Sequence, residues 1–130
     1  MATRETDLAD TIDVETDVVY MPHQSEPGER RFAFAYTISI HNRGTQPARL
    51  LTRHWLITDA EGHVQEVHGD GVVGEQPEIQ PGKSHRYSSG AVIETPVGTM
   101  EGRYGMVTAN GSSFNAAIPV FRLAVPGVLN

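Results

Sequence analysis

The chain has 130 residues, 38% of them hydrophobic, and its ten Lys and Arg against sixteen Asp and Glu give a formal net charge of −6. Binding to nucleic acid depends on Lys and Arg that neutralise phosphates, so an acidic domain of this size is poorly suited to nucleic acid as a partner. The absence of cysteine excludes disulfide bonds and thiolate metal sites.

A chain of this length buries enough surface for one hydrophobic core, so we expect a single domain, over residues 11–130. Residues 1–10 are polar and acidic, and we expect them to form a flexible N-terminal tail. No apolar run approaches the ~20 residues that span a bilayer, and the N-terminus lacks the apolar region of a signal peptide. We therefore expect a cytoplasmic protein without membrane insertion.

The first two predicted strands are marked by alternation. Apolar residues alternate with mostly acidic ones from Ile12 to Tyr20, a pattern that suits an edge strand. A loop containing two prolines follows. From Phe32 to Ile40 every second residue is large and apolar, and those between are small or polar. This second strand should bury one face.

Residues 48–59 are the predicted centre of the fold. They include the only tryptophan, Trp55, and place apolar side chains at both odd and even positions. A strand sends successive side chains to opposite sides, so this segment needs cover above and below. We predict a central strand with Trp55 between two sheets. A turn over residues 42–47, in which Gly44 supplies a positive φ, should join it to the preceding strand as a hairpin.

Shorter elements occupy the middle of the chain. Residues 64–67 and 85–89 are predicted strands, and residues 91–93 are ambiguous. A glycine-rich loop over residues 69–77 separates the two strands, and residues 96–98 form a second loop.

Near the C-terminus, residues 100–106 again alternate, and Asn110-Gly111 is a strong hairpin signal. The last strand changes phase at Pro119, which cannot donate a ladder hydrogen bond, so we predict a β-bulge at Ile118-Pro119 on an edge-facing side. No segment is typical of an amphipathic helix of useful length. The whole pattern predicts an all-β sandwich of seven or eight antiparallel strands, with a small barrel as second choice.

The glycine-rich loop contains Gly69-Asp70-Gly71-Val72-Val73-Gly74, a literal match to the dinucleotide-binding pattern G-x-G-x-x-G. That pattern needs a following helix whose N-terminus holds the pyrophosphate. Here Glu75-Gln76-Pro77 follows, and the local carboxylates would repel phosphate. A structural loop is favoured, and the alternative is a nest of amides that holds an anion or a partner's backbone.

Six histidines raise the question of a metal site, but none forms H-x-x-x-H or H-E-x-x-H. His63, His68 and Asp70 could converge near the glycine-rich loop, although scattered surface histidines are the simpler interpretation. We expect no dedicated metal site and no cofactor. No serine lies in a G-x-S-x-G elbow, and no other catalytic set is evident, so we expect a protein that is not an enzyme.

Arg53-His54-Trp55 is the other candidate. On a strand, Arg53 and Trp55 share one face and His54 takes the other. Arg and Trp are enriched in binding hot spots. A core Trp with Arg shielding its rim is the favoured interpretation, and a contact surface for a protein or peptide is the alternative.

The sequence resembles the ApaG family over about residues 12 to 126. The resemblance implies a sandwich like those of immunoglobulin and fibronectin type III domains. It also implies links to cobalt resistance, magnesium efflux and an operon for diadenosine tetraphosphate hydrolysis. Related domains in F-box and polymerase-delta-interacting proteins resemble protein-interaction modules. The matching segments are 34–38 with Asn42, 51–59, 69–77, Pro81-Gly82, 87–90, 98–102 with Tyr104, and Phe114 with 118–121.

We therefore hypothesise a non-enzymatic binding module for an unidentified protein partner, with any role in ion efflux being indirect. The alternative is a phosphate, nucleotide or divalent-metal binding domain that uses the glycine-rich loop. Unpaired sheet edges could also allow a weak homodimer. The candidate binding residues are Arg53, Trp55, Gly69, Asp70, Gly71, Gly74 and Glu75.

Overall fold

A computed structural model describes residues 5–128. Its elements in chain order are α1 (Glu5–Ala9), β1 (Ile12–Tyr20), η1 (Pro22–Gln24), η2 (Pro27–Glu29), β2 (Phe32–Asn42), β3 (Ala48–Asp59), β4 (Val64–Asp70), β5 (Glu78–Ile79), β6 (Ser84–Ile93), β7 (Val97–Thr108) and β8 (Ser113–Ala124).

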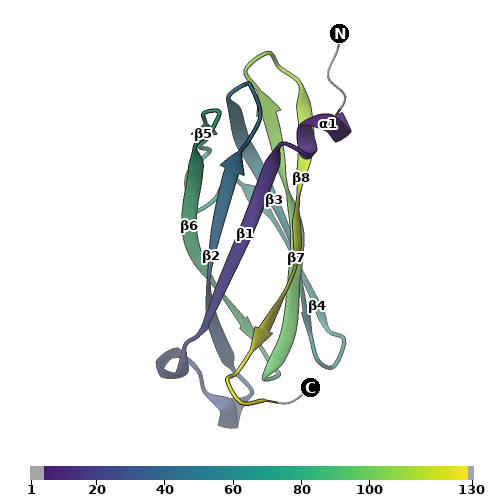
Figure 1. The fold of residues 1–130 in the computed structure, drawn as a ribbon. Helices are drawn as coiled ribbons and strands as arrows, with labels where there is room; N and C mark the ends of the chain where they lie inside the picture. The colour runs from purple at the N-terminus through teal and green to yellow at the C-terminus, as the bar shows by residue number, and fades with distance from the viewer. Residues whose placement is uncertain (1–4, 129–130) are drawn as a thin grey trace.

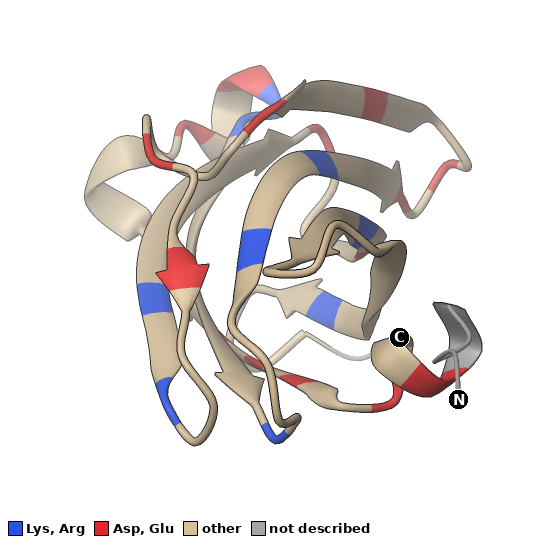
Figure 2. Ribbon diagram, turned by 90° about the horizontal axis from the view of Figure 1, so that it is seen from above, with Lys and Arg blue, Asp and Glu red and all other residues tan. Residues whose placement is uncertain are grey.

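The strands form two facing layers (Figure 1). One sheet has the order β1-β2-β6, and the other has the order β4-β3-β7-β8, with the short β5 paired to the start of β3. Every strand pair is antiparallel. Seen from above in Figure 2, the strands curve around a shared interior, with α1 beside one end. The predicted all-β sandwich of seven or eight antiparallel strands is confirmed, and β1 is an edge strand as expected.

The core lies between the layers and is centred on Trp55, which is 2% exposed. Tyr36 of the opposite sheet packs against its indole, with ring centroids 5.4 Å apart. The alternation of β2 also has the predicted effect, because its large apolar residues from Phe34 to Ile40 are buried and Phe32 is partly buried. The largest fully buried aliphatic side chains are Ile38, Ile40, Leu50, Ile93, Met100, Met106, Leu123 and Val72.

The predicted hairpin between β2 and β3 is wrong, because the chain crosses here from one sheet to the other. The strand β2 already has partners on both edges, β1 and β6, so β3 pairs elsewhere. Asn42, which is 1% exposed, holds the crossing. Its amide donates to the Gln46 and Ile79 carbonyls at 2.8 and 2.9 Å, and its Oδ1 accepts the Gly44 N–H at 2.8 Å. Gly44 does not adopt a positive φ.

Other boundaries also differ from the prediction. The predicted loop at residues 96–98 is strand from Val97 onwards. Gly69 and Asp70 are the last residues of β4, so the glycine-rich segment begins as strand and turns only from Gly71. The ambiguous residues 91–93 continue β6, and β4 extends three residues past its predicted end. Strand pairing overrides the low strand propensity of glycine in both places.

The hairpin at Asn110-Gly111 is confirmed, with Gly111 at φ +89° between β7 and β8. The edge strand β8 also contains the expected irregularity. Met100 pairs with Phe121 and Gly102 with Ile118, so one residue of β7 faces both Pro119 and Val120. The bulge therefore lies one residue beyond the predicted position.

The N-terminal segment is more structured than predicted. Residues 5–9 form α1, and Leu8 is 8% exposed within the hydrophobic core. The Leu8 carbonyl accepts hydrogen bonds from both the N–H and the hydroxyl of Thr11. Residues 1–4 of the expected tail lie outside the described part of the chain. A single buried leucine within an acidic segment gives no periodicity from which a helix could be predicted.

Candidate functional site

Arg53 joins the central strand to the glycine-rich segment. It pairs with Gly69 and Tyr104, so its side chain starts on the inner face beside Trp55. Its Nη1 donates to the carbonyls of Asp70 and Gly71 at 3.0 and 3.1 Å. A Cβ built on Gly69 would lie 2.5 Å from that nitrogen, so a larger residue at this position would displace the guanidinium. Arg53 therefore connects β3 to the end of β4, and the side chain of Trp55 beside it is buried in the core.

The turn after β4 uses its amides internally. The Gly71 N–H donates to Leu51, and Val72 and Glu75 exchange backbone hydrogen bonds of 2.8 and 3.0 Å. Val72 is fully buried, and Gly71 adopts φ +63°, where a Cβ would lie 2.2 Å from the Glu75 carbonyl oxygen. The N–H groups of Gly71, Val72 and Glu75 are therefore already occupied within the chain. Gly74 and Glu75 lie exposed at the tip.

Three tyrosines form a polar group inside the sandwich. The hydroxyls of Tyr87 and Tyr104 hydrogen-bond across the two sheets. Tyr36 lies nearby and hydrogen-bonds Ser89. Burial raises the pKa of all three phenols above the usual value of 10.0, so they keep their protons at an alkaline pH at which a free phenol would lose its own. All three tyrosines belong to the hydrophobic core.

The outer face of β3 carries a different cluster. His54 pairs in register with His68 of β4, and their rings stack with centroids 4.0 Å apart and planes 12° apart. Glu66, two residues before His68, lies on the same face. Its Oε1 is 3.0 Å from Nε2 of His54 and 2.7 Å from Nε2 of His68. These hydrogen bonds, first from His68 and then from His54, lower the pKa of Glu66.

A polar hollow of about 460 Å³ borders this cluster. Gly105 of β7 leaves the space, and the exposed Arg103 stands opposite His54 in register. The lining residues are Thr52, Arg53, His54, His68, Gly69, Asp70, Arg103, Gly105 and Asn115.

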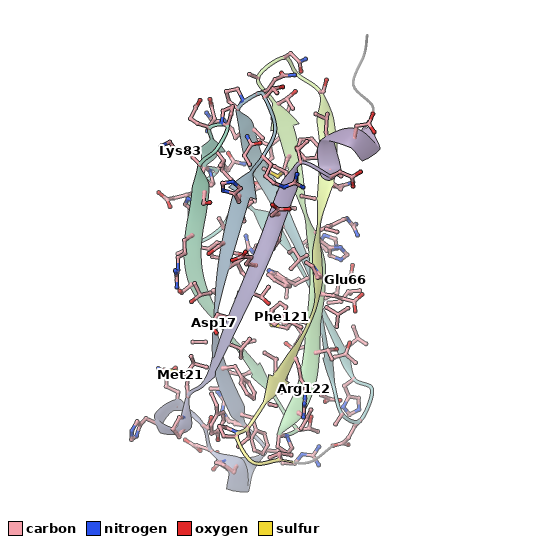
Figure 3. The ribbon with its side chains drawn as sticks, in the orientation of Figure 1. Asp17, Met21, Glu66, Lys83, Phe121 and Arg122 are labelled. Carbon is pink, nitrogen blue, oxygen red and sulfur yellow. The ribbon has the colours of Figure 1, made fainter. Side chains whose placement is uncertain are left out.

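An apolar hollow of about 620 Å³ lies at the other end of the sandwich from α1, near the C-terminus (Figure 1). Val120, at the bulge of β8, is 61% exposed there. Figure 3 shows Phe121 and Arg122 on the same stretch of β8. The lining residues are Thr58, Asp59, Ala60, Pro96, Val97, Gly98, Thr99, Val120, Phe121, Arg122 and Val128.

The structure brings together only part of the predicted site. Arg53, Gly69, Asp70 and Gly71 meet at the end of β4, whereas the glycine turn continues away from the polar hollow at Gly74.

The convergence of His63 with His68 and Asp70, which was the less favoured alternative, does not occur. His63 instead contacts Asp59 across the β3–β4 turn, at 3.2 Å. The pairing of His54 with His68 was missed because it depends on strand register, which alternation alone does not fix.

Comparison with known proteins places the chain in one family. The family model described as "ApaG domain" matches residues 22–108. The Protein ApaG of Pseudomonas aeruginosa is 56% identical over 124 residues, covering 95% of this chain and 98% of that protein.

Two solved structures share both fold and sequence with this chain. A crystal structure of a structural genomics target, SoR45, has a TM-score of 0.90 and 52% identity, covering 94% of this chain and 92% of the other. A Bordetella pertussis protein described as ApaA has a TM-score of 0.87 and 46% identity, covering 90% and 95%. Across residues 5–128, no helix has the length and apolar character needed to cross a membrane. The chain belongs to the ApaG family.

Proposed function

We propose that this domain is a binding module that recognises a protein partner through the apolar hollow at the C-terminal end of the sandwich. The observation that carries the proposal is the exposure of Val120 at the mouth of a mostly apolar hollow built from three strands. Contiguous exposed apolar surface with a polar rim is characteristic of interaction sites.

The hollow has the composition of an interface centre. Val97, Val120 and Phe121 supply apolar area, and Arg122 and Thr58 lie at its edge. Aromatic and arginine residues are enriched in the energetic centres of interfaces. Strands β3, β7 and β8 hold these residues in a rigid frame, so little conformational freedom is lost when a partner binds.

The open edge of β8 suggests the form of the partner. Strands β1 and β8 lie side by side near α1 and diverge towards the C-terminal end (Figure 1). An extended segment of a partner could run beside this part of β8 and insert an apolar side chain next to Val120, as in strand addition. The indirect connection to ion efflux that the family resemblance implies would then depend on that partner.

Site-specific photocrosslinking in cells tests the proposal. A photoreactive residue replaces Val120 in one variant and Val73, at the glycine turn, in the other; the two side chains are 61% and 63% exposed. We expect a discrete protein adduct from position 120 that a second substitution in the lining of the hollow, Val97→Asp, removes. Adducts from position 73 alone would show that the partner contacts the glycine turn instead of the apolar hollow. Identical adducts from both positions would show that crosslinking does not depend on a specific surface.

A further inference from the structure

We propose that His54, Glu66 and His68 form a binding site for a divalent transition-metal ion on the outer face of the β4-β3-β7-β8 sheet. The inference is independent of the proposed protein-binding hollow, which lies elsewhere on the domain. One donor atom from each of the three side chains lies within 4.8 Å of the other two. Figure 3 shows Glu66 on the outer side of this sheet, away from the β1-β2-β6 layer.

The strand register creates the site. His54 and His68 are directly opposite each other on neighbouring antiparallel strands, and Glu66 shares the face of His68 because it is two residues away. The strand β3 lies inside its sheet, between β4 and β7, so the backbone at His54 is held on both sides. The His54 side chain is only 13% exposed, whereas those of His68 and Glu66 are 63% and 54% exposed. One donor is therefore fixed, and two can adjust.

The donor spacing is already close to that around a metal. Zinc binds imidazole nitrogen and carboxylate oxygen at roughly 2.0–2.2 Å, which places neighbouring donors of a tetrahedral ion about 3.3 Å apart. Oε1 of Glu66 lies 3.0 and 2.7 Å from the two Nε2 atoms. A metal that replaces these hydrogen bonds requires the donors to separate by only a few tenths of an ångström. Rotation of the exposed His68 ring would turn its Nε2 towards an ion held by Nε2 of His54.

The donor set selects the class of ion. Two imidazoles and one carboxylate suit Zn²⁺, Ni²⁺ or Cu²⁺, whereas Mg²⁺ and Ca²⁺ prefer oxygen donors alone. Three protein ligands leave a fourth position for water or another ligand. The polar hollow beside His54 and His68 gives that position access to solvent.

Isothermal titration calorimetry on the untagged full chain, with Zn²⁺ and in parallel with Mg²⁺, tests the site. We expect one Zn²⁺ per chain and no saturable Mg²⁺ binding. His68→Ala and Glu66→Gln should each weaken Zn²⁺ binding by at least roughly 10–100-fold. That is the usual cost of losing a residue that only supports a metal ligand. His63→Ala is the matched control, because His63 is also an exposed histidine beside a carboxylate, and should leave the affinity unchanged.

Nitrogen-15 NMR of the imidazoles provides a second measurement that does not depend on stability. Zn²⁺ should shift the Nε2 resonances of His54 and His68 together and leave His63 unmoved. Amide spectra of the variants confirm that they fold. Equal affinities for wild type and His68→Ala, or shifts spread over all six histidines, would show adventitious binding and overturn the proposal. One Zn²⁺ shared by two chains would also overturn it.

Discussion

Three consecutive residues of β3 have different roles on the two faces of the strand. On the inner face, Trp55 is 2% exposed, and Arg53 donates hydrogen bonds to the backbone carbonyls of Asp70 and Gly71 at the end of β4. On the outer face, one residue away, His54 faces His68 and Glu66 at the surface. Inside, the Arg53 guanidinium has fixed backbone partners, whereas Nε1 of Trp55 is buried without a hydrogen bond. Outside, Glu66 hydrogen-bonds both His54 and His68, and these are the contacts that the proposed metal ion would replace.

The comparison shows that residue type alone does not locate a binding surface. Arg and Trp are typical hot-spot residues, yet here they serve the core. The outer histidines gain a shared geometry only from register. Substitutions on the inner face should therefore change stability, and substitutions on the outer face should change ligand binding.

The largest effect is expected for Trp55→Ala. Loss of a buried aromatic side chain costs about 3–5 kcal/mol, from lost transfer energy and the cavity that remains. Urea denaturation followed by circular dichroism measures the change in the free energy of unfolding. Val64→Ala, at a valine that is 58% exposed, should stay within about 0.5 kcal/mol. Similar losses for both variants would contradict the central position of the indole.

Gly102→Ala should have the next largest effect. A Cβ at Gly102 would lie 2.0 Å from the backbone oxygen of His54, so β3 and β7 must separate. Overpacking of this kind costs about 1–3 kcal/mol. Gly90→Ala is the matched control, because its Cβ would be 3.4 Å from the Phe34 oxygen, an ordinary contact. Thermal unfolding should rank Gly102→Ala well below Gly90→Ala.

The paired tyrosine hydroxyls should make the domain sensitive to alkali. Burial raises the pKa of Tyr87 and Tyr104 in the folded chain, while in the unfolded chain these phenols lose protons near pH 10. Above about pH 10 the unfolded state therefore binds fewer protons than the folded state, and stability falls as pH rises.

Tyr87→Phe should test this dependence. At neutral pH it should cost about 1 kcal/mol, because the Tyr104 hydroxyl loses its partner. The decline of the urea midpoint from about pH 8 to about pH 11 should become shallower than in wild type, because one phenol no longer titrates. A decline as steep as that of wild type would show that this buried group does not determine the alkaline sensitivity.

The smallest expected effect concerns Arg103. It stands in register with His54 on the outer face, so its positive charge opposes a bound cation. Arg103→Ala should tighten Zn²⁺ binding roughly two- to fivefold at low salt, as expected for an exposed charge, and added salt should remove the gain. Arg86→Ala, at an exposed arginine of the other sheet, should leave Zn²⁺ affinity unchanged.

Alternation predicted the fold class well because strands such as β2 bury one face and leave the other accessible to solvent. The β2 pattern and the core position of Trp55 followed directly from it. The crossing after β2 was not predictable in the same way. A short polar segment suits either a hairpin or a change of sheet, and the choice depends on whether β2 already has two neighbours.

The candidate site was less accessible from sequence. The pattern identified Arg53 and the glycine-rich segment as candidate binding residues, but the position of the guanidinium over Gly69 was not predictable, because it depends on how β3 pairs with β4. The cluster of His54, Glu66 and His68 spans two strands whose relative register the sequence leaves open. Val120 is a single valine next to a proline, and only the bulge makes it prominent.

The short helix α1 has a practical consequence for work with this domain. It contacts β8, the last strand of its sheet, and contributes Leu8 to the core. Trimming the chain to begin at residue 11 would therefore uncover apolar surface and a stretch of unpaired backbone together. Preparations of the shortened chain should self-associate through the part of β8 that α1 no longer covers. Affinity tags are best attached upstream of Glu5, where the helix can still close against the strand.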